Sequence, residues 1–226
     1  MIIKKVVKHI VAKCFGKGIK ELKNTAHYST ISFDIFDTLV CRTCDKPEKV
    51  FEIVENKYNE IHRGEEVHGF LNLRKSAEKQ ARYKNKWKEI SLEQIYENIE
   101  PHIEKDVLNE LKRIEIDTEI EVCIPNKEVV EVFNGISDKN VYLISDMYLP
   151  KKVIETILNK CNIMKYNELF VSSETGLMKR SGELYEYIFE GNKISKKEWL
   201  HIGDHSIADF IVPKILNIKS FLYKRD

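Results

Sequence analysis

The sequence predicts an α/β protein in which helices cover a parallel sheet and a helical subdomain is inserted after the first strand. From about residue 125 onward, apolar β-rich runs alternate with helical patterns, as in parallel sheets with covering helices. The block 45–124, which follows the first such run, has almost no strand signal. A chain of 226 residues is long enough for one core with an insertion of this size.

The overall composition names no class of partner. Hydrophobic residues make up 42% of the chain, charged residues 32%, and the formal net charge is +1, which is ordinary for a globular protein. No run of about 18 apolar residues predicts a membrane-spanning helix. Beyond the N-terminus, no basic, aromatic-laced face of the kind that binds nucleic acid is found. The odd, scattered cysteines indicate reduced thiols in a cytoplasmic protein: Cys14, Cys41, Cys44, Cys123 and Cys161.

Residues 1–26 are predicted to form a basic amphipathic N-terminal helix. Within 1–24, lysines outnumber the single acid, Glu21, and apolar residues recur at helical spacing beside them. Lysines interrupt any signal-peptide core, so a cleaved leader fits poorly. The helix would lie at an anionic membrane surface, dock a partner, or pack on the core with a solvated lysine face. The lysines are Lys4, Lys5, Lys8, Lys13, Lys17, Lys20 and Lys23.

The core is predicted to comprise residues 27–44 and 125–226. Five apolar runs rich in β-branched and aromatic residues predict its strands, and helical periodicity lies between the later ones. The strands are expected at 30–36, 140–145, 168–172, 198–203 and 218–223, and the helices at 127–136, 151–161, 182–190 and 206–216.

The insertion, residues 45–124, is predicted to be a helical cap. Pro47 stands near the first turn of its first helix, and Ser91 with Gln94 occupies the positions of a capping box. A block of this length is too long for a loop. Its helices are expected within 46–61, 70–87, 91–99 and 104–122.

Polar residues end four of the predicted strands or follow them closely. In an open α/β sheet, ligands bind at the carboxyl ends of the strands, so these residues are the candidate site. They supply a carboxylate nucleophile, a hydroxyl donor, a fixed cation and carboxylates suited to a metal. They are Asp34, then Ser145 with Asp146, then Lys179, and finally Asp204 with Asp209.

This ordered set resembles the four motifs of the haloacid dehalogenase-like (HAD) hydrolase superfamily, and the resemblance extends from residue 30 onward. Asp34, with Thr38 and Leu39, matches the family's DxDx(T/V)(L/V) motif. The family's strand-terminal Ser/Thr, its Lys and its acidic pair match Ser145, Lys179 and Asp204 with Asp209. Membership implies a Rossmann-like parallel sheet with an inserted cap.

The resemblance also implies a mechanism. Asp34 would attack phosphorus and form an aspartyl-phosphate that water hydrolyses. Mg²⁺ would be held by Asp34, the backbone carbonyl of Phe36 and Asp204, with Asp209 in or just outside the first coordination shell. Ser145 would donate to the transferring oxygens, and Lys179 would offset their charge. Arg180, one residue further on, is the alternative to Lys179.

The chain departs from the family's pattern at Phe36. Phosphotransferring members have there a second aspartate that acts as general acid and base. Asp37 lies one residue further along, where its side chain points elsewhere, so an Asx-type turn hydrogen bond is expected for it; a catalytic role remains an alternative. If Asp37 is not the acid, three explanations of the missing acid remain. The substrate has a good leaving group, His205 or the cap donates the proton, or the site binds phosphate without turnover.

Several further residues have two interpretations. Arg42 could line the cap side of the site, because arginine suits bidentate contact with phosphate. The same role is an alternative for Arg74, Glu78 and Arg82, but for these three we favour i,i+4 pairing on an exposed helix. Cys41 and Cys44 could form a redox or half-zinc motif, but no second pair accompanies them. His201, unlike His205, is interpreted as a packed core residue.

Four phrases of the sequence look like a bacterial HAD group associated with glycosyltransferases of capsule and surface-polysaccharide synthesis. They are "SFDIFDTLVCR", "ISDMYLP", "SSETGLMKRSGELY" and "HIGDHSIADF". This implies a phosphorylated sugar, nucleotide-sugar or polysaccharide-linked phosphate as substrate. A glycosyltransferase or the inner membrane face would be the partner of residues 1–24. Two hypotheses follow: a Mg²⁺-dependent phosphohydrolase, or a catalytically weak phosphate-binding and docking module.

Overall fold

The computed structural model describes residues 11–22, 25–192 and 194–225. Its main sheet has five parallel strands in the order β5-β4-β1-β6-β7, so the predicted α/β fold with a parallel sheet is confirmed. Each strand lies inside or against a range expected from the sequence. The strands are β1 (Thr30–Phe33), β4 (Asn140–Ser145), β5 (Glu168–Val171), β6 (Trp199–Gly203) and β7 (Lys219–Leu222).

Strand β1 is the centre of the sheet and sets the position of the site. It pairs with β4 on one side and with β6 on the other, in the register Ser32–Tyr142 and Ser32–His201. All four of its residues are buried, as expected for a strand covered on both faces. Because all five strands run in the same direction, the residues that follow β1, β4 and β6 meet at one edge of the sheet.

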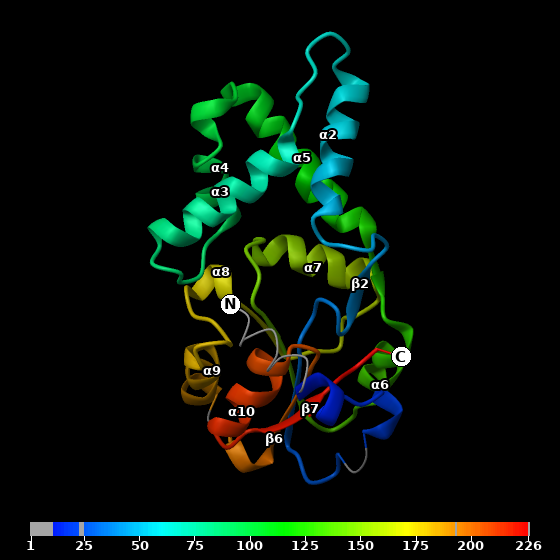
Figure 1. Ribbon diagram of the computed structural model, residues 1–226. Helices are drawn as coiled ribbons and strands as arrows, with labels where there is room; N and C mark the ends of the chain where they lie inside the picture. Colours follow the sequence, from blue (N-terminus) through cyan, green and yellow to red (C-terminus); the bar gives the residue numbers. More distant parts are fainter. Residues whose placement is uncertain (1–10, 23–24, 193, 226) are drawn as a thin grey trace.

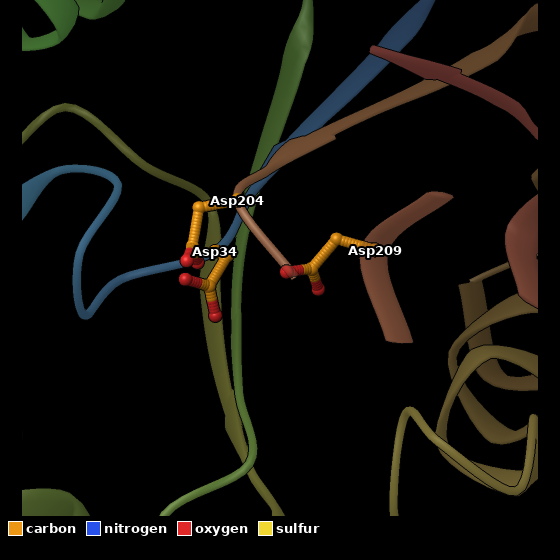
Figure 2. Close-up of side chains that lie close together, drawn as sticks. All are labelled: Asp34, Asp204 and Asp209. Carbon is orange, nitrogen blue, oxygen red and sulfur yellow. The ribbon is translucent and has the colours of Figure 1, made fainter. Parts of the chain in front are cut away.

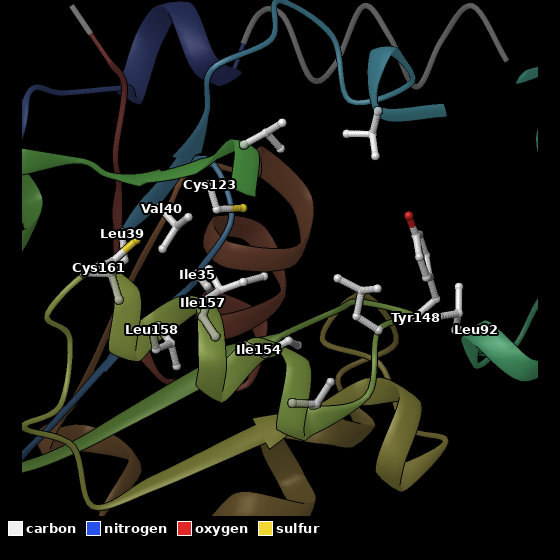
Figure 3. Packing of buried hydrophobic residues seen from close by; sticks show 14 of the residues in the cluster. Ile35, Leu39, Val40, Leu92, Cys123, Tyr148, Ile154, Ile157, Leu158 and Cys161 are labelled. Atoms are coloured by element: carbon white, nitrogen blue, oxygen red, sulfur yellow. The ribbon is translucent and has the colours of Figure 1, made fainter. Parts of the chain in front are cut away.

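Two apolar clusters lie on opposite faces of the sheet. On one face, α6 (Lys127–Asn134) and α7 (Lys151–Lys160) pack on alternate strand residues such as Ile31 and Leu143. Figure 3 shows the α7 side of this packing, with Ile154 and Ile157 facing Ile35. On the other face, α9 (Glu183–Asn192) packs on the residues between them, such as Tyr142 and Ile144.

The helix expected at 206–216 is not one regular α-helix. It consists of η4 (Ser206–Ile211), which is a π-helix, followed by α10 (Val212–Ile215), and Pro213 lies in the first turn of α10. A short helix that the sequence did not predict, α8 (Ser172–Thr175), follows β5. The wide turn of a π-helix is a common feature of functional sites, and here it carries Asp209.

The block 45–124 is helical. Figure 1 shows its helices together at the end of the molecule beyond α7 and α8. Ser91 and Gln94 make the predicted capping box, with reciprocal hydrogen bonds of 3.3 Å and 2.9 Å. The helices are α2 (Lys49–Ile61), α3 (Phe70–Lys84), α4 (Leu92–Glu97), the 3₁₀ turn η2 (Glu100–His102) and α5 (Lys105–Val122).

Two short strands lie at the base of this helical block. β2 (Val40–Arg42) and β3 (Cys123–Pro125) pair antiparallel, with Arg42 opposite Cys123. The chain therefore enters and leaves the helical block through one two-stranded ribbon. Neither strand was predicted, because three residues are too few for a readable alternation.

The Arg74 side chain is fully buried, whereas an exposed position was expected for it. Its guanidinium donates to both oxygens of Glu115 on α5, at 2.8–3.2 Å. It also lies between the rings of Phe51 and Tyr148, 4.6 Å and 4.9 Å from their centroids. The expected i,i+4 pairs with Glu78 are present as well, from both Arg74 and Arg82. Since Tyr148 lies in the loop after β4, this network ties the helical block to the loop that follows Ser145, the last residue of β4.

The N-terminal segment departs from the single helix expected over 1–26. Residues 11–15 are helical, but residues 1–10 and 23–24, which hold much of the predicted basic face, lie outside the described residues. Gly16 ends the helix, with its N–H donating to the carbonyl of Ala12 at 3.0 Å, as glycine commonly does. Lys17 then forms a bridge with Tyr223 beside β7, and η1 (Ile19–Glu21) follows. No helix in the described part of the chain is long and apolar enough to cross a bilayer.

Candidate active site

Asp34 stands directly after the central strand. Its backbone N–H donates to the carbonyl of Ile202 on β6 at 2.8 Å, which continues the ladder of the sheet by one residue. The Thr38 hydroxyl donates to one of its carboxylate oxygens at 3.1 Å. Asp34 is only 7% exposed. These hydrogen bonds hold it through its backbone and through the following turn, and it lines the cavity described below.

The turn after Asp34 is held by backbone hydrogen bonds. The N–H groups of Leu39 and Val40 both donate to the carbonyl of Ile35 at 2.9 Å. Asp37 has a left-handed backbone, with φ of 62°, a conformation that aspartate tolerates better than most residues. The side-chain Asx bond expected for Asp37 was a wrong prediction: among the described residues only its backbone N–H bonds in the turn, to Val40.

Lys179 bridges two of the candidate carboxylates. Its ammonium lies 2.5 Å from an oxygen of Asp34 and 2.7 Å from an oxygen of Asp209. The neighbouring residue, Arg180, is exposed. Asp146 fixes the backbone of this loop, because its two oxygens accept the N–H groups of Lys179 and Arg180 at 2.8 Å and 3.4 Å. Asp146 is therefore a positioning group for the lysine.

Asp209 reaches the site because the π-helix η4 folds its side chain back over the end of β6. The His205 N–H donates to one oxygen of Asp209 at 2.9 Å. A Cβ added to Gly203 would lie only 2.5 Å from the Asp209 carboxyl carbon, so glycine is required at the end of β6. This close approach explains the Gly-Asp sequence that precedes the π-helix.

His201 does more than pack in the core. It is fully buried, and its Nε2 lies 3.2 Å from the same Asp209 oxygen that binds Lys179. Its Nδ1 lies 2.8 Å from the Ser32 hydroxyl, which in turn accepts from the Trp199 indole N–H at 2.8 Å. Because the carboxylate can only accept, a neutral His201 carries its proton on Nε2 and accepts from Ser32. The interpretation of His201 as merely packed missed this contact.

Burial and neighbouring charges shift the pKa values of these groups in different directions. Burial raises the pKa of Asp34, and Asp209 and Asp204 add to this, against the lowering effect of Lys179. Burial alone would raise the pKa of Asp209, but the Lys179 ammonium and the His201 hydrogen bond lower it well below the usual range. Burial would lower the pKa of Lys179, but Asp209 and Asp34 raise it. Burial lowers the pKa of His201, which favours its neutral form.

A cavity of about 770 Å³ opens over these groups. It brings together all the predicted site residues except Thr38, which contributes through Asp34. These residues are Asp34, Phe36, Asp37, Arg42, Ser145, Asp146, Lys179, Asp204, His205 and Asp209. The cavity wall also includes residues that the sequence did not single out, among them Trp87, Glu89, Met147 and Met178. No motif marks Trp87 and Glu89, because only the folded helical block brings them over the sheet edge. Arg82 lines the cavity as well as pairing with Glu78, so both interpretations of this residue hold.

Ser145 and His205 differ in what they can offer. Ser145 is 1% exposed and lines the cavity, and its hydroxyl has no hydrogen-bond partner among the described residues. It is therefore available to a ligand. The Nδ1 of His205 accepts the N–H groups of Ile207 and Ala208 at 3.2 Å and 3.1 Å, and so caps the π-helix. A proton on Nδ1 would displace both of these hydrogen bonds.

Cys41 and Cys44 are both free thiols, and Cys41 lies buried on β2. Burial raises the pKa of each thiol. A raised pKa disfavours the thiolate that redox chemistry and metal binding need. The structure thus gives no support to a functional role for this pair.

Three carboxylates form a group suited to a divalent cation. Asp34, Asp204 and Asp209 each offer an oxygen, and the three oxygens lie within 4.8 Å of one another. In Figure 2 the carboxylates of Asp34 and Asp204 lie side by side, and Asp209 faces them from η4. Lys179 supplies one positive charge against three carboxylates. Oxygen ligands and an excess of negative charge are what Mg²⁺ requires, so the residues fit this ion.

No family model matches the sequence, and no curated protein matches it. Solved structures do match the fold. The HAD-hydrolase YfnB from Bacillus subtilis, crystallised with magnesium, superposes with a TM-score of 0.59 at 14% identity, over 85% of this chain and 87% of that one. A HAD family enzyme from Bacteroides thetaiotaomicron gives a TM-score of 0.60 at 13% identity, over 87% and 94% of the two chains.

Another similar structure is the L-2-haloacid dehalogenase from Xanthobacter autotrophicus with chloropropionic acid covalently bound. It gives a TM-score of 0.56 at 8% identity, over 85% of this chain and 76% of that one. At such identities the similarity establishes the fold. The chain therefore has the fold of HAD hydrolases, and its chemistry has to be inferred from its own residues.

Proposed function

We propose that this protein is a Mg²⁺-dependent phosphohydrolase of the HAD type that acts through an aspartyl-phosphate. One observation carries the proposal: Asp34, at the end of the central strand, lies 2.5 Å from Lys179 and shares its cavity with the unpartnered hydroxyl of Ser145. A nucleophile, a fixed cation and a free hydrogen-bond donor around one space are the groups that phosphoryl transfer needs.

In this mechanism Asp34 is the nucleophile. One of its oxygens attacks phosphorus, and the bond from phosphorus to the leaving oxygen breaks. Thr38 holds the other oxygen by its hydrogen bond of 3.1 Å, so the carboxylate has a fixed orientation for attack. Water then attacks the phosphorus of the aspartyl-phosphate and restores the carboxylate.

Ser145 and Lys179 would bind the oxygens of the phosphoryl group. The Ser145 hydroxyl donates a hydrogen bond, and the Lys179 ammonium offsets the charge that develops in the transition state. Asp209 and Asp146 hold Lys179 in place, through its ammonium and its backbone N–H respectively. A lysine fixed in this way needs no rearrangement during the reaction.

Mg²⁺ would be held by Asp34, the Phe36 carbonyl and Asp204, and its charge would offset that of the carboxylates and the substrate. Asp209 suits the outer position better, because both its oxygens already accept hydrogen bonds, from Lys179, His201 and the His205 backbone. The sequence left both positions for Asp209 open.

The helical block 45–124 is proposed to act as the cap that selects the substrate. Arg82, Trp87 and Glu89 contribute its part of the cavity wall. The proposed substrate class is a phosphorylated sugar, a nucleotide-sugar or a polysaccharide-linked phosphate. A role beside a glycosyltransferase or at the inner membrane face, through residues 1–24, rests on the resemblance of the sequence phrases and on the basic amphipathic pattern of these residues.

A phosphate-binding and docking module is the second candidate function. Phe36, which stands where phosphotransferring relatives have the general acid, favours it. Such a module would bind phosphate at Ser145 and Lys179 but would not release it from a substrate.

Phosphate release from purified protein with Mg²⁺ distinguishes the two functions. Sugar phosphates, nucleotides and an acyl phosphate would be compared for the wild type and Asp34→Asn, and for nucleotide-sugars the nucleoside monophosphate and sugar phosphate would be measured as products. Asp138→Asn is the matched control, because Asp138 is exposed and precedes β4 at the opposite edge of the sheet. Turnover that is lost only in Asp34→Asn and with chelator supports the enzyme. Phosphate binding without turnover of any substrate supports the docking module.

A further inference from the structure

The leaving group of the proposed reaction has no evident source of a proton. A leaving oxygen that departs from phosphorus either takes a proton from an acid or departs as an anion. Position 36, beside the nucleophile, is a phenylalanine, whose ring lines the cavity and carries no proton to give. Apart from the nucleophile, Asp204 and Asp209 at the proposed Mg²⁺ site, and the lysine and arginines, four ionisable groups of the cavity wall have to be considered: Asp37, Glu89, Asp146 and His205.

Asp146 and His205 are already committed to the backbone. Each oxygen of Asp146 accepts a backbone N–H, from Lys179 and from Arg180. The Nδ1 of His205 accepts two backbone N–H groups of the π-helix. An imidazolium at His205 would need a proton on that same atom, so the charged, acidic form costs both hydrogen bonds. Asp146 and the Nδ1 of His205 therefore both act as hydrogen-bond acceptors for the backbone.

Glu89 and Asp37 are no better placed. Glu89 is an ion-pair partner of Arg82, and the same oxygen accepts the Ile90 N–H at 2.9 Å. A carboxylate in these contacts acts as an acceptor. Asp37 is exposed at the rim, on a turn whose left-handed backbone separates it from the end of the strand. Among the residues that the structure describes, none of these four groups is therefore held by a hydrogen bond toward the nucleophile as an acid.

Arg42 supplies a cation where an acid is missing. Its guanidinium lies 4.7 Å from the centroid of the Phe36 ring, and it lines the cavity. Glu119 accepts two of its N–H groups, at 3.0 Å and 3.4 Å. An arginine has five N–H groups, and the others have no partner among the described residues. Burial alone would lower the pKa of Arg42, but Glu119 raises it, so this side chain stabilises an anion and donates no proton.

We infer that the substrate is a phosphoanhydride, in which the transferred phosphoryl group is linked to a second phosphate that departs as an anion bound by Arg42. The inference rests on the proposed function and narrows it to diphosphates with a free terminal phosphate, such as nucleoside diphosphates and sugar diphosphates. A guanidinium matches the paired oxygens of a phosphate. Two further arginines line the cavity, Arg180 and Arg82, of which Arg82 is already paired with Glu78 and Glu89.

The reaction balances without a protein acid. Asp34 forms a bond to the terminal phosphorus, the bond to the bridging oxygen breaks, and its electron pair stays on the leaving phosphate. That phosphate leaves with one additional negative charge, which Arg42 offsets. Water then attacks the aspartyl-phosphate, the bond between phosphorus and the Asp34 oxygen breaks, and the water proton leaves with the inorganic phosphate or with solvent.

Matched substrates test the inference in the wild-type protein with Mg²⁺. The first pair is a nucleoside diphosphate and the monophosphate of the same nucleoside, and the second is 4-nitrophenyl phosphate and phenyl phosphate. A positioned acid contributes about 10²- to 10⁴-fold for a poor leaving group. We therefore expect kcat/KM for the anhydride to exceed that for the ester by at least about 10²-fold, and the better aryl leaving group to react much faster.

Variants at Phe36 and Arg42 test the same inference independently. Phe36→Asp should raise turnover of the monophosphate and of phenyl phosphate. It should therefore lower two kcat/KM ratios, that of the diphosphate to the monophosphate and that of 4-nitrophenyl phosphate to phenyl phosphate. Arg42→Gln should lower anhydride turnover more than 4-nitrophenyl phosphate turnover, and Arg42→Lys, which retains the ion pair with Glu119, should lie between. Asp138→Asn should leave both ratios unchanged.

The outcomes separate this inference from the proposed function. Esters turned over as fast as anhydrides, in a reaction that still requires Asp34, would overturn the phosphoanhydride inference and leave the phosphohydrolase intact. Monoester turnover lost selectively in Asp37→Asn would identify Asp37 as the acid and would also overturn it. If no substrate is turned over in a way that requires Asp34, the proposed function and the inference both fail.

Discussion

Replacing His201 by asparagine should lower kcat about 10- to 150-fold with little change in KM. His201 Nε2 lies 3.2 Å from the Asp209 oxygen that binds Lys179, in a fully buried position. Asparagine is too short to reach this oxygen. The charged Asp209 carboxylate would lose a hydrogen bond, and a hydrogen bond to a charged group contributes about 1.5–3 kcal/mol. Asp209 would then hold the Lys179 ammonium less firmly.

The fold-change follows from the assumption that this loss appears in the transition state. At about 1.36 kcal/mol for each tenfold change in rate, a loss of 1.5–3 kcal/mol corresponds to the range stated above. The effect should appear in kcat because Lys179 offsets charge that develops during the reaction, rather than charge already present in the bound substrate.

Glutamine and a control histidine make the prediction specific. In His201→Gln the amide nitrogen can reach the position of Nε2, so kcat should stay within about fivefold of the wild type. His68→Asn, at an exposed position, should change nothing. The assay is steady-state phosphate release with Mg²⁺, beside thermal unfolding of each variant. Equal losses of kcat in the asparagine and glutamine variants would refute the reasoning, as would an asparagine variant with reduced stability but normal kcat.

Three further predictions concern stability. Arg74→Leu should lower the free energy of unfolding by about 3–5 kcal/mol in urea titrations, because the buried Glu115 carboxylate loses its ion-pair partner and keeps only the hydrogen bond from the Tyr96 hydroxyl; a loss below 1 kcal/mol would contradict the buried pair. Mg²⁺ at about 100 times its Kd should stabilise the wild type by about 2.7 kcal/mol, and Asp204→Asn should abolish most of this gain, whereas an equal gain in both proteins would exclude Asp204 as a ligand. With chelator present, Asp34→Asn should be increasingly stabilised relative to the wild type as the pH rises from 3.8. The folded-state pKa of Asp34 is raised, so its ionisation destabilises the native protein; a difference that shrinks as the pH rises would contradict this.

The sequence predicted the sheet well because four of its five strands, β1, β4, β5 and β6, are buried on both faces along nearly all of their length. Such strands are continuous apolar runs, like the one that precedes Asp34, and they need no tertiary information to be recognised. The residues at their carboxyl ends were equally predictable, because parallel strands bring those ends to one edge. Lys179 was the most difficult of these residues to predict, because several residues separate it from the end of β5. The spacing of its motif nevertheless predicted it as the site lysine.

Contacts that depend on tertiary packing were not predictable. Arg74 has the i,i+4 neighbours of an exposed helix position, and only the approach of Phe51, Tyr148 and Glu115 shows why it is buried. The sequence pattern correctly predicts His201 as a buried strand residue. Its hydrogen bond to Asp209 depends on the π-helix η4, which no sequence pattern predicts.

Local backbone geometry accounts for the remaining differences. The turn at Asp37 uses backbone bonds to Ile35 where a side-chain bond was expected, because its left-handed φ directs the chain back without help from the carboxylate. The N-terminal helix was extended too far because its lysine and apolar pattern continues past Gly16. The glycine, and the bridge from Lys17 to Tyr223, override that pattern.

Covalent trapping of the phosphorylated enzyme shows directly whether Asp34 is the nucleophile. Protein mixed with a diphosphate substrate and Mg²⁺ would be quenched in acid within one turnover, digested, and analysed by mass spectrometry. The account predicts the mass of one added phosphoryl group on the peptide that contains Asp34, present in the wild type and in Asp138→Asn and absent from Asp34→Asn. Substrate turnover with no phosphorylated peptide at any quench time, or with the phosphoryl group on another residue, would contradict it.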